Sequence, residues 1–441
     1  MSQVNAKPQA RSIQSNFVWT LAGYAVYAAC QWGMLVALAK LGSPGMVGQF
    51  ALGLAITAPL LMFTNLQLRS VLATDCRGEF DFPDYLGLRV TSTLLALLAL
   101  PVIALCSQCG GGTFVVVLLV GVAKGFESVS DVYFGRLQQH ERMQPIAQSL
   151  ITKGLLSLAV FWVALWLTHN LMWACAGLIV AWALVLFLYD VPVSRQAAKG
   201  SASRPRFSAR VLGRLAWRSL PLGVMSMLVS LQVNIPRYFI EGHLGAAALG
   251  IFAALVYPMT AGTFVVTALG QAALPVLARH FAARDAIGRP FLVLLTKISA
   301  GGLLLGGSGV LLCLGAGRQL LLAFYRPEYA QHVDVLIWLA VAASLNYVAT
   351  FLNAGVTATR EFHVLTVPYI LQAIVALGMS AVLVARFGLV GAAWASCGIS
   401  ALGCAIPLVI LVRIRMRHTV KRPASPRRIT VGRVVVDPDR A

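Results

Sequence analysis

Long apolar stretches separated by short polar segments run from residue 17 almost to the end of the chain. Most of them hold no charged residue over about 20 positions, the length that an α-helix needs to cross a bilayer. The pattern predicts an all-α polytopic membrane protein with about twelve transmembrane helices, at 17–39, 47–68, 85–105, 113–136, 146–168, 171–189, 219–240, 246–270, 291–315, 333–355, 362–385 and 388–412.

The longest polar segment, 190–218, is basic and lies in the middle of the chain. It predicts an organisation with an N-terminal segment 1–16, a six-helix lobe 17–189, the linker 190–218, a second six-helix lobe 219–412 and a basic tail 413–441. A short internal repeat supports two related lobes, because Gly48-Gln-Phe-Ala51 matches Gly250-Ile-Phe-Ala253 at an offset of about 202 residues. Two repeated bundles around a central cavity are typical of alternating-access transporters.

Charge predicts the orientation of the spans. The chain carries 35 Lys and Arg against 15 Asp and Glu, a net charge of +20, but the basic residues gather in alternate loops and in the tail. With the N-terminus inside, the outer loops hold four cations, at Lys40, Arg318, Arg326 and Arg386. The positive-inside rule then places both termini in the cytoplasm. Because topology explains the charge, no nucleic-acid partner is expected.

One predicted span carries several charges on one face. Lys124, Glu127 and Asp131 follow one another at helical spacing, with Ser128 beside them. In one interpretation Lys124 pairs with Glu127 along the helix while Asp131 bonds a neighbouring helix. In the other they form the polar wall of a central cavity, where cations meet an anionic headgroup and a carboxylate binds a proton or cation. Ionisable residues inside a membrane favour the functional interpretation.

Five further cations lie within or at the ends of predicted spans. Three are near inner ends and are expected to snorkel to the cytoplasmic headgroups, namely Arg69, Arg89 and Lys153. Lys297 is deeper. Arg237 either bridges Glu241, four residues on, or uses its guanidinium to bind phosphate at two points.

No catalytic constellation accompanies these charges. The chain has no H-E-x-x-H motif, no Walker lysine loop and no D-x-D motif of a glycosyltransferase. We therefore expect neither an enzyme nor a bound metal or cofactor.

Four stretches of the chain resemble a known family, at 41–50, 65–75 and 124–143, and at 234–238 with the downstream 245–253. They are similar to the Wzx-type polysaccharide and O-antigen flippases of the multidrug/oligosaccharidyl-lipid/polysaccharide exporter superfamily. The resemblance extends over about residues 12–415 and leaves out the basic tail.

The resemblance implies a multi-pass protein of the bacterial inner membrane that moves undecaprenyl-pyrophosphate-linked oligosaccharide from the cytoplasmic to the periplasmic leaflet by alternating access. The unit would serve O-antigen, capsule or exopolysaccharide synthesis, with membrane lipids and other assembly proteins as partners. Cavity cations would bind the headgroup, and the candidates here are Lys124, Arg237, Lys297 and Arg69. Glu127, Asp131 and Ser128 are candidates for ion coupling or for polar cavity groups.

Two alternatives stay open. A cation-coupled multidrug exporter of the same superfamily would favour acidic cavity residues, whereas the intramembrane excess of cations here indicates an anionic substrate. A membrane-embedded polysaccharide polymerase or ligase would need a larger outer loop than 317–332, which is the largest expected.

Overall fold

The computed structural model describes residues 13–75, 78–107, 110–197, 204–282, 287–359 and 366–420. Within these ranges every regular element is a helix. Ten helical segments are long and apolar enough to cross a membrane, so the chain is a multi-pass membrane protein. The long helices are α1 (Ile13–Leu41), α2 (Pro44–Thr64), α4 (Phe82–Cys106), α5 (Gly111–Gln139), α6 (Met143–Thr168), α7 (Leu171–Val185), α9 (Ala209–Ala282), α10 (Arg289–Phe324), α11 (Val333–Ala358) and α12 (Thr366–Val420). Short helices are α3 (Leu68–Thr74) and α8 (Val191–Ala197).

Two helices are too long to cross a bilayer once. At 1.5 Å per residue α9 would extend about 110 Å, against a hydrocarbon core of about 30 Å. Its backbone leaves the helical conformation at Gly245 (φ 80°), between two predicted spans. The backbone of α12 breaks at Gly388 (φ 60°), also where two predicted spans meet. Both positions have positive φ, which glycine adopts without the steric cost that other residues meet.

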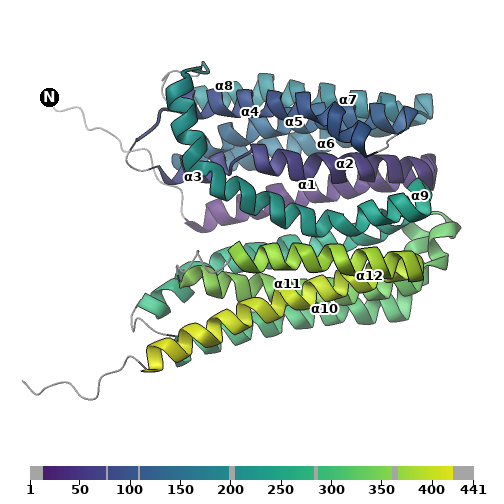
Figure 1. Cartoon of the computed structure of the whole chain (residues 1–441). Helices are drawn as coiled ribbons and strands as arrows, with labels where there is room; N and C mark the ends of the chain where they lie inside the picture. The colour runs from purple at the N-terminus through teal and green to yellow at the C-terminus, as the bar shows by residue number, and fades with distance from the viewer. Residues whose placement is uncertain are drawn as a thin grey trace, which may run out of the picture.

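The α12 segment doubles back at its break. The amide Nε2 of Gln372 donates a hydrogen bond of 2.9 Å to the carbonyl of Ile399, which a continuous helix would hold far away. In Figure 1, α1 to α8 form the upper part of the molecule and α10 to α12 the lower part, while α9 begins in the upper part and leads into the lower one. Helix α9 packs against α2 on one side and against α11 and α12 on the other.

The repeated glycines lie in a reciprocal contact between α2 and α9. A Cβ atom added to Gly48 would lie 1.7 Å from the carbonyl oxygen of Ala246, and one added to Gly250 would lie 1.9 Å from that of Pro44. With the repeat offset of about 202 residues, Pro44 corresponds to Ala246 and Gly48 corresponds to Gly250. The contact of Gly48 with Ala246 is therefore the counterpart of the contact of Gly250 with Pro44. Such self-complementary contacts are typical of two-fold related elements.

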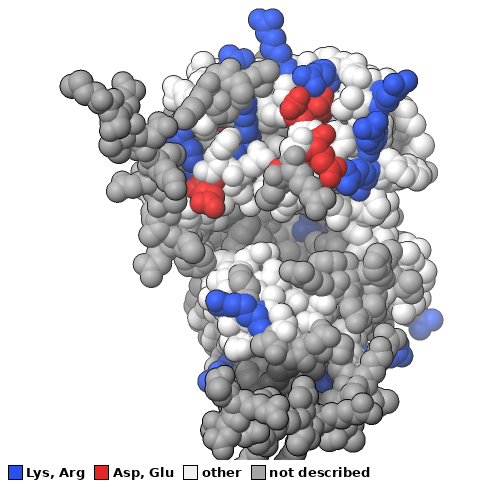
Figure 2. Space-filling model, turned by 90° about the vertical axis from the view of Figure 1, so that its left-hand side faces the viewer, with Lys and Arg blue, Asp and Glu red and all other residues white. Residues whose placement is uncertain are grey.

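The described part of the predicted linker packs against the N-terminal helices. The backbone N–H of Arg206 donates to the carbonyl of Pro83 at 2.9 Å. Its guanidinium lies 3.2 Å from Asp81 and 3.3 Å from Asp84. Figure 2 views the molecule from this end, and basic and acidic side chains gather in the upper part of the view. The start of the predicted linker is helical, since a π-turn (Leu186–Asp190) and α8 continue from α7. The predictions for 1–12 and 421–441 lie outside the described residues.

The snorkelling prediction is wrong for two of its three cations. The side chain of Arg89 is fully buried, and that of Lys153 is 1% exposed. Each finds a carboxylate inside the protein: Arg89 pairs with Asp131, and Lys153 Nζ lies 3.6 Å from Asp190 Oδ2, whose side chain is also 1% exposed. The second oxygen of Asp190 accepts a hydrogen bond from the Ser149 hydroxyl. Pairing inside the protein therefore replaces the route to the headgroups.

The glycine contact predicts a position-specific loss of stability. Gly48→Ala and Gly250→Ala force the backbones of α2 and α9 apart, and overpacking of this kind costs about 1–3 kcal/mol. We expect both variants to unfold at lower temperature in detergent micelles, measured by intrinsic fluorescence. Gly307→Ala on α10 is the matched control, because no atom lies within 4 Å of the added methyl group. Equal melting temperatures for all three variants would contradict the contact.

The Lys153–Asp190 pair predicts non-additive substitutions. Lys153→Met or Asp190→Leu alone leaves a buried charge without its partner, at a cost of roughly 3–5 kcal/mol. The double variant K153M/D190L removes both charges and should recover most of the lost melting temperature. A double variant as unstable as the sum of the single variants would show that the two groups are not coupled.

Candidate functional site

A cavity of about 1000 Å³ lies between the upper and lower parts of the molecule. Its walls come from α1, α2 and α5 of the upper part, from both halves of α9, and from α11 and α12 of the lower part. The prolines Pro236, Pro258 and Pro368 lie in these walls. The cavity is therefore built from helices distant in sequence, as expected for a site between two bundles.

Lys124 reaches this cavity from the middle of α5. Its ammonium group lies 2.7 Å from the Glu127 carboxylate and 4.9 Å from the ring centroid of Trp182. The other oxygen of Glu127 accepts a hydrogen bond of 2.6 Å from the hydroxyl of Tyr27 on α1. The ion pair proposed along the helix and the position at a cavity wall thus occur together, and Glu127 is the resident counter-ion of Lys124.

Arg237 reaches the same cavity from α9. Its Nη1 donates a hydrogen bond of 3.1 Å to the side-chain oxygen of Asn234, one turn earlier. No ion pair joins it to Glu241 or to another carboxylate of the described residues, so of the two alternatives for Arg237 the i,i+4 bridge is not formed. The guanidinium keeps most of its five donors available.

The two cations act on a shared region of the cavity. Both line the same cavity, together with Tyr257. Among the described lining residues these two carry the only charges, and none is a carboxylate. The arrangement can hold an anion: Lys124 has a carboxylate partner that it can exchange, and Arg237 has no carboxylate partner within the described residues.

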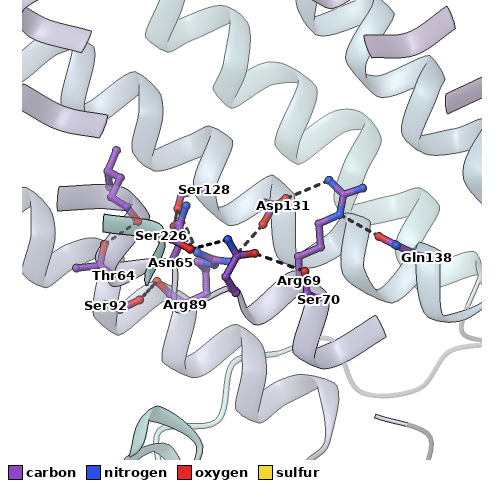
Figure 3. A network of polar contacts seen from close by, with 12 residues as sticks. Thr64, Asn65, Arg69, Ser70, Arg89, Ser92, Ser128, Asp131, Gln138 and Ser226 are labelled. Atoms are coloured by element: carbon purple, nitrogen blue, oxygen red, sulfur yellow. Dashed lines mark hydrogen bonds and ion pairs between the residues drawn. The ribbon is translucent and has the colours of Figure 1, made fainter. Parts of the chain in front are cut away.

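Asp131 belongs to a separate network in the upper part of the molecule (Figure 3). Its carboxylate lies 3.2 Å from Arg69 of α3 and 3.3 Å from Arg89 of α4. Asn65 accepts hydrogen bonds from Arg89 and from the Ser128 hydroxyl. Arg69 also donates to Tyr24 at 2.9 Å and to Gln138 at 3.1 Å. The network ties α3, α4 and α5 together.

The structure therefore separates the predicted site residues into three groups. Lys124 and Arg237 line the cavity, with Glu127 bonded to Lys124 behind the wall. Arg69, Ser128 and Asp131 lie in the network of Figure 3. Lys297 is exposed on α10 and is not among the described residues that line the cavity.

Several cavity groups have no distinct signal in the sequence. Aromatic side chains line it at Tyr27, Trp32 and Tyr257, and neutral amides line it at Asn346 and Asn353. Each is a single polar or aromatic residue in an apolar stretch, where core packing explains it equally well. The spacing of seven residues places Asn346 and Asn353 on one face of α11. It does not show that this face lines a cavity.

Contacts between the upper and lower parts close one end of the cavity. Lys40 at the end of α1 donates to the carbonyl of Ala323 at 2.9 Å, and Arg326 donates in return to the carbonyl of Lys40 at 2.9 and 3.2 Å. The indole N–H of Trp32 donates a hydrogen bond of 2.9 Å to the hydroxyl of Tyr325. That hydroxyl in turn donates to the carbonyl of Ala254. The opposite end faces the viewer in Figure 2, where a recess separates the two parts.

Comparison with known proteins finds a similar sequence and similar folds. The chain is 25% identical over 380 residues to the capsular polysaccharide biosynthesis protein CapF of Staphylococcus aureus, covering 86% of this chain and 94% of the relative. No family model matches the chain. The lipid II flippase MurJ in an inward closed conformation superposes with a TM-score of 0.69 at 10% identity, covering 91% of each chain.

A second solved structure gives the same fold. An inward-facing multidrug resistance MATE family transporter of the MOP superfamily superposes with a TM-score of 0.63 at 12% identity, covering 92% of this chain and 95% of the transporter. The resemblance expected from the sequence is confirmed: the chain is similar to a capsular polysaccharide biosynthesis protein over most of its length and has the fold of the multidrug/oligosaccharidyl-lipid/polysaccharide exporter superfamily.

Proposed function

We propose that the protein flips an undecaprenyl-pyrophosphate-linked oligosaccharide from the cytoplasmic to the periplasmic leaflet of a bacterial inner membrane. The observation that carries this proposal is the intramembrane cavity whose only charged lining residues, within the described chain, are Lys124 and Arg237. A diphosphate left unpaired in a low-dielectric interior would be prohibitively costly. Similarity to a capsular polysaccharide biosynthesis protein favours a lipid-linked sugar as the cargo.

The proposed architecture has twelve spans in two six-helix lobes, 17–189 and 219–412, joined by the linker 190–218. The breaks at Gly245 and Gly388 support it, because each divides one long helix into two lengths that can each span a bilayer. The distribution of Lys and Arg supports cytoplasmic termini. In this orientation the contacts of Lys40 with Ala323 and Arg326 close the periplasmic end.

In the proposed mechanism the headgroup enters from the cytoplasmic side while the prenyl chain stays in lipid. Arg237 meets the diphosphate first, because it has no carboxylate partner among the described residues, and its planar fork suits two phosphate oxygens. Lys124 then exchanges part of its bond to Glu127 for the second phosphate. Loss of the cross-contacts at the closed end would open the cavity to the other side.

Ion coupling, if it uses these carboxylates, is better assigned to Glu127 than to Asp131. Asp131 lies between two arginines, 3.2 and 3.3 Å away, and is not among the described residues that line the cavity. Glu127 has a single cationic partner at bonding distance, and that partner lines the cavity. When Lys124 turns to the substrate, Glu127 becomes the group free to take up a proton.

The alternatives fit the cavity less well. A cationic drug would meet Lys124 and Arg237 with no carboxylate among the described lining residues to receive it. A polymerase or ligase would need catalytic groups around a reacting atom, whereas the fold is that of transporters.

The test is export by variants in a strain that lacks the chromosomal gene. We expect Arg237→Gln to reduce periplasmic exposure of the completed lipid-linked unit at least tenfold, because the lost charge-assisted bonds are worth roughly 1.5–3 kcal/mol. Exposure is measured by labelling spheroplasts from outside, with membrane protein level as a reference. Lys297→Gln is the matched control, since this exposed lysine is not among the described cavity residues.

Three outcomes are decisive. Completed units that accumulate but stay inaccessible in the R237Q strain support flipping. Full exposure in that strain would remove the role of the cavity cation. Failure to complete the lipid-linked unit in the gene-deleted strain would instead indicate an assembly enzyme.

A further inference from the structure

One wall of the cavity is polar without being charged. It is formed by α11, α12 and the α9 residues facing them, and its polar groups are the amides Gln232, Asn346, Asn353 and Gln372 with the hydroxyls Ser396 and Ser400. The cations lie elsewhere on the lining, on α5 and on α9. The cavity thus divides into a cationic region and a neutral, hydrogen-bonding wall.

The two asparagines have no structural role that explains them. Asn346 lies near the middle of α11, yet its side chain is exposed and makes no hydrogen bond with the described part of the chain. Asn353 lies about two turns further on, on the same face, and its side chain is likewise unbonded within the described residues. Ala342 and Ala349 line the cavity beside them and leave the amides accessible. Unpaired amides at this depth are costly unless a wet cavity or a ligand receives them.

The two glutamines are held in fixed positions. Gln232 Nε2 donates to the carbonyl of Tyr369 at 2.8 Å, and Gln372 Nε2 donates to that of Ile399 at 2.9 Å. Each bond uses one donor and leaves the side-chain oxygen as an acceptor. Fixed acceptors next to unbonded amides, which both donate and accept, form a surface suited to hydroxyl and acetamido groups.

Aromatic rings complete the lining. Tyr27, Trp32, Tyr257 and Tyr369 all line the cavity. Their rings offer an apolar face together with a polar edge. A sugar ring has the same two characters, with C–H groups on its faces and hydroxyl groups around its rim.

We propose that the wall carrying Gln232, Asn346, Asn353 and Gln372 is the glycan subsite, and that it takes uncharged sugars bearing hydroxyl and acetamido groups. The inference rests on the proposed function, which places the diphosphate at Arg237 and Lys124. A uronic acid on the glycan would bring a carboxylate against a wall with no cation among its described residues, where desolvation opposes binding. The neutral wall would therefore select the sugar, and the cations would select the diphosphate.

The test compares three soluble probes on the full-length protein in detergent micelles by calorimetry. They are farnesyl diphosphate, farnesyl diphosphoryl-N-acetylglucosamine and the matching glucuronic acid compound. We expect N-acetylglucosamine to raise the affinity about tenfold or more over the sugar-free probe, because unpaired amides gain partners. The glucuronic acid probe should bind at least about tenfold more weakly than the neutral one, a comparison that needs no variant.

The double variant N346L/N353L separates the subsite from the diphosphate site. It should lose the gain from the sugar while binding farnesyl diphosphate within about twofold of the unaltered protein. Gln319→Leu is the control, because this exposed amide of α10 is not among the described cavity residues.

The outcomes distinguish the two proposals. If all three probes bind equally and N346L/N353L behaves like the unaltered protein, the glycan subsite is refuted while the diphosphate site stands, provided that R237Q weakens every probe. If no probe binds, or R237Q changes nothing, the proposed function fails and the subsite with it.

Discussion

The cost of leaving a charge unpaired inside a membrane determines how the upper part of this molecule is built. Burial without a partner costs several kcal/mol, and the described charges of the N-terminal helices follow this constraint. Lys153 pairs with Asp190, and Lys124 pairs with Glu127. Asp131 forms ion pairs with both Arg89 and Arg69. Arg237 departs from this pattern, since its only bond within the described residues goes to a neutral amide. The exception lies in the cavity wall, where a ligand can supply the missing anion.

Both parts of the molecule pack helices through small residues, such as Gly23 against Ala147 in the upper part, and the upper part adds ion pairs between its described helices. In the upper part, ion pairs join α3, α4 and α5 through Asp131, and join α6 to the π-turn after α7 through Lys153 and Asp190. In the lower part, helices approach through small residues: the Gly306 position of α10 faces Ser344, and the Gly262 position of α9 faces the Tyr347 ring. Close packing of small residues is the usual means of helix association in lipid.

The sequence predicted a multi-pass, all-helical membrane protein because lipid permits few alternatives. A backbone in hydrocarbon must satisfy its own hydrogen bonds, so apolar length alone indicates a helix, and the breaks at Gly245 and Gly388 fell between predicted spans. Side-chain direction could not be predicted in this way. The position of a residue along a span does not tell which way its side chain points around the helix axis. The sequence therefore could not show whether Lys297 faces the cavity; in the structure it is not among the described lining residues.

The buried cations show a second limit of sequence reasoning. Arg89 pairs with Asp131, which lies on another helix. Lys153 pairs with Asp190, which is the first residue of the predicted linker 190–218 and lies in the π-turn after α7. A cation near the end of an apolar stretch looks the same whether it snorkels or turns inward, because only the fold brings its carboxylate to it. The same holds for Asn346 and Asn353, whose neutral amides stand out only when the cavity is known.

Under the proposed function, the unequal pairing of the two cavity cations has a consequence for turnover. A transporter must bind its cargo on one side and release it on the other, so two unpaired cations would hold a diphosphate too firmly to let it leave. Glu127, supported by the Tyr27 hydroxyl, competes with the substrate for Lys124 and re-forms the 2.7 Å pair when the cavity empties. Arg237 therefore supplies most of the affinity for the diphosphate. Glu127 limits the affinity at Lys124 and favours release of the diphosphate.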